Sequence, residues 1–76
     1  MATYIIVNRQ SNLIVNVVST STPLRSSAKL KAIKAGELTL DHYYRLKKKA
    51  QELGVLVDAG ALAKLSPNFC ELLKLK

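Results

Sequence analysis

Tyr4-Ile5-Ile6-Val7-Asn8 and Leu13-Ile14-Val15-Asn16-Val17-Val18 are the two runs of sequence that decide the fold. Both are dense in β-branched residues, which favour the pleated surface of a sheet over a helix. The four polar residues between them, 9–12, make a turn-length connection, and Asn12 tolerates the left-handed conformation that a tight turn needs. The sequence therefore predicts a β-hairpin near the N-terminus.

This hairpin is expected to carry apolar side chains on both of its faces. With a four-residue loop, the expected pairs are Val7 with Ile14, Ile6 with Val15, and Tyr4 with Val17. One face then holds Tyr4, Ile6, Leu13, Val15 and Val17, and the other holds Thr3, Ile5, Val7, Ile14, Asn16 and Val18. Helices that cover one face would leave a second apolar face and two strand edges to a partner. Helices wrapped around both faces are the alternative.

The rest of the chain carries helix signals. Thr22-Pro23 and Ser66-Pro67 are typical of helix starts, and Gly36 and Gly54 of helix ends. Helices are expected over residues 23–35, 39–53 with Thr39 as N-cap, 61–65 after a cap at Asp58, and 67–75. Residues 55–57 are expected to form a short third strand or a buried turn. The predicted fold class is α+β, a hairpin packed with three to four short helices in a single domain, 1–76.

Two of the expected helices show an apolar stripe at helical spacing. Over residues 39–53 the stripe is Leu40, Tyr43, Leu46 or Lys47, Ala50 and Leu53. In the last helix Phe69, Leu72 and Leu73 are expected to point inward. These stripes would cover the hairpin.

The composition excludes several classes of protein. Cys70 is the single cysteine, so no disulfide closes within the chain, and no Cys/His cluster offers a zinc site. The N-terminus lacks the basic region and cleavage site of a signal peptide. No apolar run approaches the roughly 18 residues that span a bilayer. We therefore expect a protein with no cofactor, no metal and no membrane partner that is not secreted through a signal peptide.

Catalytic groups are sparse. A Cys-His nucleophile pair needs both side chains in hydrogen-bond reach with a third group that orients the base. His42 falls in the first turn of one expected helix, and Cys70 lies between core positions of another, where a buried structural thiol is the ordinary interpretation. No phosphate-binding glycine loop is present. The expectation is that the protein is not an enzyme.

A net charge of +7 points to acidic partners. The candidate contacts with phosphates or acidic surfaces are Lys31, Lys34, Arg45, Lys48 and Lys49. A small basic protein that binds nucleic-acid phosphates through Arg45, Lys48 and Lys49 is therefore the alternative function. Sequence-specific DNA recognition is disfavoured, because a helix-turn-helix arrangement after residue 54 would need bulky apolar residues where Gly60 and Ala63 stand.

The two opening runs resemble the hairpin that begins small phage-encoded virion-associated proteins, with a Tyr-x-Ile-Val-Asn … Val-Val-Asn-Val-Val cadence. The resemblance covers about residues 3–18. It implies a head or tail accessory protein that adds its hairpin to a neighbour, located in the virion or the host cytoplasm.

The leading expectation is a non-enzymatic structural interaction protein of a large assembly, such as a capsid-stabilising accessory protein of a phage particle. Its partners would be protein neighbours, with further copies of the chain among the alternatives. The protein-interaction residues expected on the hairpin are Tyr4, Ile5, Val7, Ile14, Asn16 and Val18.

Overall fold

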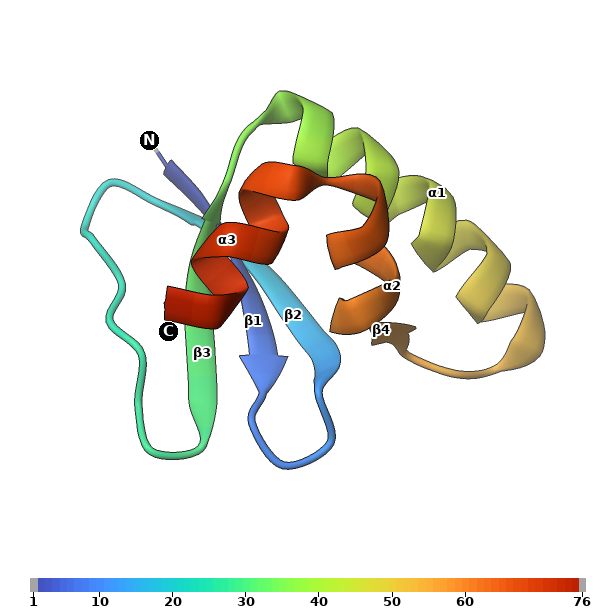
Figure 1. Cartoon of the computed structure of the whole chain (residues 1–76), viewed down its shortest axis with the longest axis horizontal. Helices are drawn as coiled ribbons and strands as arrows, with labels where there is room; N and C mark the ends of the chain where they lie inside the picture. Colours follow the sequence, from blue (N-terminus) through green and yellow to red (C-terminus); the bar gives the residue numbers. More distant parts are fainter. Residues whose placement is uncertain (1, 76) are drawn as a thin grey trace.

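The computed structural model describes residues 2–75 and shows a four-stranded sheet with three helices (Figure 1). The elements in chain order are β1 (Ala2–Asn8), β2 (Leu13–Thr20), β3 (Leu30–Ala35), α1 (Glu37–Leu53), β4 (Val57–Asp58), α2 (Ala59–Leu65) and α3 (Pro67–Leu75). The mixed α+β class and the N-terminal hairpin are confirmed, and the helix count lies within the expected range. The strands are more numerous than predicted.

The strands are ordered β3-β1-β2-β4, and every neighbouring pair is antiparallel. Val7 pairs with Ile14 as predicted, but the register then shifts, so that Ile6 pairs with Asn16 and Tyr4 with Val18. The predicted pairings of Ile6 with Val15 and Tyr4 with Val17 are wrong, because β2 holds one extra residue, Val15, as a bulge.

The bulge exchanges the faces of the second half of β2. Val17 pairs with the fully buried Ile5 and packs against the core, whereas Asn16 and Val18 lie on the opposite face. The sequence had predicted the reverse for all three. A one-residue shift moves every later side chain to the other face of a sheet, which explains the whole set of corrections.

The predicted helix over residues 23–35 is wrong. Residues 21–29 connect β2 to β3 without forming a helix or strand, and Leu30–Ala35 is a strand that pairs with the second edge of β1. Serine hydroxyls hold this segment: Ser26 Oγ accepts from the Ala32 amide at 3.1 Å, and Ser27 Oγ from the Leu30 amide at 3.1 Å. Such side-chain acceptors compete with helical hydrogen bonds, and the segment also covers the outer edge of β3.

The remaining helices lie close to their predicted positions. α1 begins at Glu37 with Gly36 as N-cap, earlier than the predicted cap at Thr39, and ends at Gly54 as predicted, with φ 71°. Asp58 caps α2, its Oδ1 accepting from the Gly60 amide at 2.7 Å. α3 presents Phe69, Leu72 and Leu73 to the core, as predicted. Residues 55–57 were expected to form a short strand or a buried turn; Val57 belongs to the two-residue strand β4, whereas Val55 and Leu56 are exposed.

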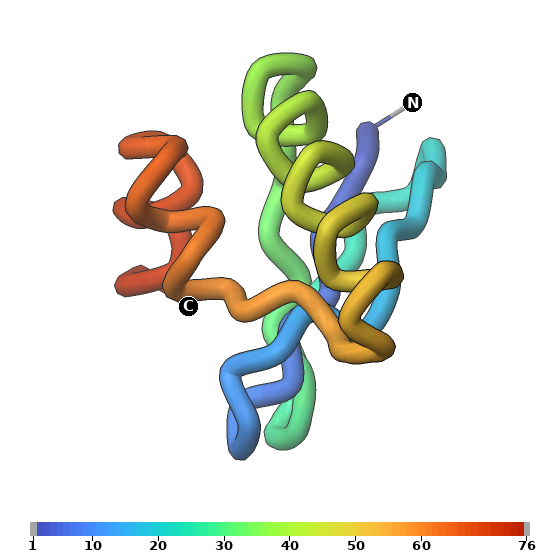
Figure 2. Tube along the Cα trace, turned by 90° about the vertical axis from the view of Figure 1, so that its right-hand side faces the viewer, coloured from blue at the N-terminus to red at the C-terminus, as the bar shows by residue number. Residues whose placement is uncertain are grey.

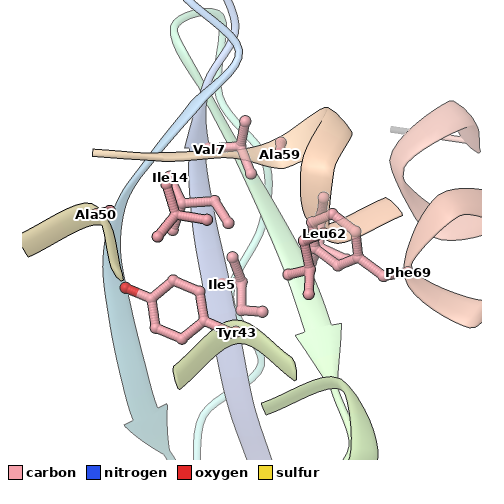
Figure 3. Packing of buried hydrophobic residues seen from close by; sticks show 10 residues of the cluster. Ile5, Val7, Ile14, Tyr43, Ala50, Ala59, Leu62 and Phe69 are labelled. Atoms are coloured by element: carbon pink, nitrogen blue, oxygen red, sulfur yellow. The ribbon is translucent and has the colours of Figure 1, made fainter. Parts of the chain in front are cut away.

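One face of the sheet carries the core (Figure 3). Ile5, Val7 and Ile14 from the hairpin meet Tyr43 and Ala50 of α1, Leu62 of α2 and Phe69 of α3. Figure 2 shows α2 and α3 together on one side of the strands. Leu53, predicted in the apolar stripe, is 70% exposed, because α1 extends beyond the sheet at its C-terminal end. The helices therefore cover one face of the hairpin and leave the other.

Candidate protein-interaction groove

The outer edge of β2 is paired over only part of its length. β4 pairs with Leu13 and Ile14, and among residues 2–75 no strand lies beside β2 from Val15 to Thr20 on that side. β4 begins only at Val57, opposite Ile14, because the chain arrives from α1 through the irregular residues 54–56. The sheet therefore has an open edge of six residues, roughly 20 Å long at the usual rise of a strand.

The hydrogen-bond pattern identifies which groups point outward from this edge. Ala32 of β3 lies opposite Ile6 of β1, but its amide donates to Ser26 Oγ and not to β1. Ile6 therefore directs its own backbone N–H and C=O groups toward β2. Ile6 pairs with Asn16, so the backbone groups of Asn16 point toward β1. Because this direction alternates from one residue of a strand to the next, the amides of Val17 and Ser19 point away from β1. The Val17 amide donates to Asn16 Oδ1 at 2.8 Å, which agrees with this direction.

A groove of about 370 Å³ lies between this edge and α1. We call it the edge groove. Its lining residues are Ile14, Val15, Asn16, Val17, Ser19, Tyr43, Tyr44, Lys47, Ala50, Gln51, Val55, Leu56 and Val57. The outward backbone of β2 forms one wall, and one turn-spaced face of α1, with Tyr44, Lys47 and Gln51, forms the other. Such a groove has the dimensions and the exposed backbone to accept an extended chain.

Three side chains of α1 give the edge groove its chemistry. Lys47 Nζ lies 6.0 Å from the centroid of the Tyr43 ring, where the ring face attracts a cation. The Tyr44 ring packs edge-on against Tyr43 with centroids 5.3 Å apart, and it is 51% exposed. Burial, and to a lesser extent the neighbouring Tyr44, raises the pKa of Tyr43 above 10.0. The groove therefore offers an aromatic wall beside one ammonium group.

Exposed apolar side chains line the edge groove and a hollow that adjoins it. We call Val15, Tyr44, Leu53, Val55 and Leu56 the apolar rim; each is between 42% and 70% exposed. A second, shallower hollow continues from Val55 and Leu56 across to Leu53 and Ala61. Scattered exposed apolar residues are ordinary on a protein surface, but these lie beside an open strand edge, which makes them a candidate contact surface.

The six interaction residues expected on the hairpin do not share one surface. Ile5, Val7 and Ile14 are at most 2% exposed and lie beneath the helices, so a partner cannot contact them in this fold. Their assignment to the interaction surface is corrected: they form the core, because the helices cover this face. Tyr4, Asn16 and Val18 lie on the opposite face, where Asn16 is exposed, Val18 is half-buried and Tyr4 is buried.

The five basic residues expected to bind phosphates or acidic surfaces are also separated. Lys31 and Lys34 project to opposite faces of β3, and Lys31 Nζ lies 3.4 Å from the Leu73 carbonyl at the end of α3. Arg45, Lys48 and Lys49 are exposed in the second half of α1, which lies toward β4 at the other side of the sheet. The fold therefore offers no single stripe made of all five.

Groups that could carry catalysis are few. His42 on α1 and Cys70 on α3 are both half-buried. Within residues 2–75 no three His, Cys, Asp or Glu side chains gather in a way that could hold a metal ion. The described helices also include none that is both long and apolar enough to cross a bilayer.

Sequence reasoning missed the most distinctive residues of the edge groove, Ser19 and Lys47. Lys47 stood only as an alternative to Leu46 in the apolar stripe of α1. The signal that could have identified it is its position one residue from that stripe, at the edge of the buried face. Ser19 had no local signal, because its importance depends on where β4 ends.

Comparison with known proteins adds no relative. No protein-family model matches the chain, and no curated protein or solved structure matches it.

Proposed function

We propose that this chain is a non-enzymatic structural interaction protein of a large assembly and that it binds a protein neighbour through the open edge of β2. The observation that carries the proposal is the edge groove, in which the outward amides of Val17 and Ser19 lie opposite an exposed aromatic and apolar surface. An added strand gains main-chain hydrogen bonds from such an edge and side-chain contacts from the wall beside it.

The sequence of β2 supports the same proposal. Proteins usually protect an open edge with charged residues or proline. β2 reads LIVNVVST and contains neither. Its protective features are the bulge at Val15 and Asn16, whose side chain occupies the Val17 amide. An edge without charges or proline next to an apolar groove remains suited to pairing at the Ser19 amide.

The proposed setting is a phage particle, with the chain as a head or tail accessory or capsid-stabilising protein. This part rests on the resemblance of residues 3–18 to the opening hairpin of small virion-associated proteins. The net charge of +7 suits a position against acidic neighbours. The location would be the virion, or the host cytoplasm before assembly.

The test is sedimentation of the chain in lysates of cells that make it, with detection by a specific antibody. The wild-type chain is expected in a fraction of high mass that survives nuclease and high salt. Ser19→Pro removes one outward amide while leaving the β1 side of the ladder intact, since proline is tolerated where the amide faces outward on an edge strand. We expect this variant to sediment as free protein.

Ser19→Ala is the matched control. Both substitutions remove the contact between the Thr3 and Ser19 hydroxyls, which lie 3.0 Å apart, but alanine keeps the amide. The Ser19→Ala chain is expected to stay in the high-mass fraction. A wild-type chain that sediments as a free monomer would contradict the proposal. Release by nuclease, or by Lys48→Glu combined with Lys49→Glu, would instead favour the nucleic-acid alternative.

A further inference from the structure

Resting on the proposed function, we infer the chemistry of the partner: the edge groove binds an extended segment of another protein that carries apolar residues on one side and carboxylates positioned for Lys47. The segment would form a strand beside the open part of β2, on the same edge that β4 occupies next to Leu13 and Ile14. The open edge alone does not determine the partner, since main-chain pairing is indifferent to side chains.

Charge complementarity selects the acidic partner. Among the described residues that line the edge groove, Lys47 is the single charged side chain, and none is acidic. Its ammonium is held above the Tyr43 ring, beside the space that an added strand would fill. A carboxylate placed there would form a charge-assisted hydrogen bond in a partly desolvated site, whereas a cation would be repelled.

Strand geometry assigns the side chains of the segment. Alternate residues of an added strand face opposite sides of the sheet. Residues on the α1 side would contact Tyr44, Lys47 and Gln51, so this side takes apolar groups and the carboxylate. Residues on the other side would lie next to Asn16 and Val18, which are exposed and half-buried. Apolar contacts continue onto Val55 and Leu56 at the end nearest β4.

A second copy of the chain fits this site less well. Pairing of two β2 edges would bring two Lys47 side chains and two chains of net charge +7 to one interface. Like charges across an interface oppose association. The same lysine that repels a second copy attracts an acidic segment, so self-association serves as an outcome of the test.

The experiment is a selection from a displayed library of random linear peptides on the full chain, with binding of recovered peptides measured by fluorescence anisotropy. Recovered peptides are expected to be rich in Asp and Glu among apolar residues. Lys47→Glu should weaken the binding of these acidic peptides about tenfold. A selection on the Lys47→Glu chain should enrich Lys and Arg in place of Asp and Glu. Lys48→Glu makes the same charge change on the outer face of α1 and should leave affinity within about twofold.

The outcomes separate the two proposals. Acidic peptides that bind wild type and Ser19→Ala but not Ser19→Pro, and whose charge preference reverses with Lys47→Glu, support both. Peptides lost with Ser19→Pro but indifferent to Lys47→Glu would overturn the acidic partner and leave strand addition standing. Equal selection by wild type and Ser19→Pro would overturn both. A wild-type dimer that Ser19→Pro dissociates would replace the acidic segment with a second copy.

Discussion

The hydroxyl groups of Thr39 and Ser66 lie 2.8 Å apart in the interior, where they join the first turn of α1 to the junction of α2 and α3. Both residues are 6% exposed, and they are the buried polar residues of the described chain. The two hydroxyls satisfy each other. The sequence had assigned each to an N-cap, but packing of the helices brings them together.

Removal of one of these hydroxyls is expected to be costly. Thr39→Val keeps the shape of the side chain and leaves the Ser66 hydroxyl buried without its partner, which should lower the free energy of unfolding by about 1–3 kcal/mol. Combined Thr39→Val and Ser66→Ala should cost less than the sum of the single changes, because no orphaned hydroxyl remains. Urea unfolding followed by circular dichroism measures the cycle. If the two substitutions lowered the free energy of unfolding additively, the hydrogen bond between Thr39 and Ser66 would be contradicted.

Stability is expected to fall at alkaline pH because of Tyr43. Burial raises the pKa of this phenol in the folded protein above the value of 10.0 that it has when exposed. The folded state therefore resists ionisation: its full stability is present below pH 10, and it is lost as the pH rises through the folded pKa. Tyr43→Phe should therefore reduce the fall in the free energy of unfolding between neutral and alkaline pH, measured by urea unfolding at each pH.

Tyr44→Phe is the control for this measurement, since it leaves the buried phenol in place. Burial is the larger cause of the Tyr43 shift and the charge of Tyr44 the smaller one. The Tyr44→Phe chain should therefore keep most of the alkaline decline. If the free energy of unfolding fell equally with rising pH in wild type and Tyr43→Phe, the Tyr43 ring would not be buried as described.

The end of α1 depends on a left-handed residue. Gly54 has φ 71°, and the Val55 amide reaches back to the Ala50 carbonyl at 3.0 Å, as in a helix-terminating turn. Gly54→Ala should reduce the free energy of unfolding by about 1 kcal/mol, because a side chain is strained in this region.

Gly36 provides the comparison at the other end of α1. Its φ is −86°, and an added Cβ would meet nothing within 4 Å. No side chain caps the helix there, so Gly36→Ser should stabilise the chain by a few tenths of a kcal/mol. Thermal unfolding of the two variants should therefore change in opposite directions.

Local patterns predicted the parts of the fold that local physics decides. The β-branched hairpin, the left-handed stop at Gly54, the Asp58 cap and the proline start at Pro67 each follow from a residue and its immediate neighbours. Leu30–Ala35 does not. Its alanines and lysines favour a helix, but β1 has a second edge to pair, and that demand comes from residues far away in sequence.

The candidate site was less predictable for the same reason. Val15 is one β-branched residue among several, and nothing beside it in the sequence indicates the bulge that reverses the faces of Asn16 and Val18. The edge groove depends on where β4 stops and on which side of α1 faces β2. Both are set by packing, so the sequence predicted the hairpin but not which of its residues stay exposed beside α1.

Asn16 Oδ1 accepts a hydrogen bond from the outward Val17 amide at 2.8 Å. Asn16→Ala removes this acceptor, so exchange of the Val17 amide with solvent should accelerate roughly five- to tenfold, the equivalent of one net hydrogen bond. Two-dimensional NMR after transfer to deuterium oxide measures the rate. The Tyr4 amide, which faces β2 inside the sheet, is the internal control and should not change. An unchanged Val17 rate would mean that this amide does not point outward, and the open edge of β2 would lose its main support.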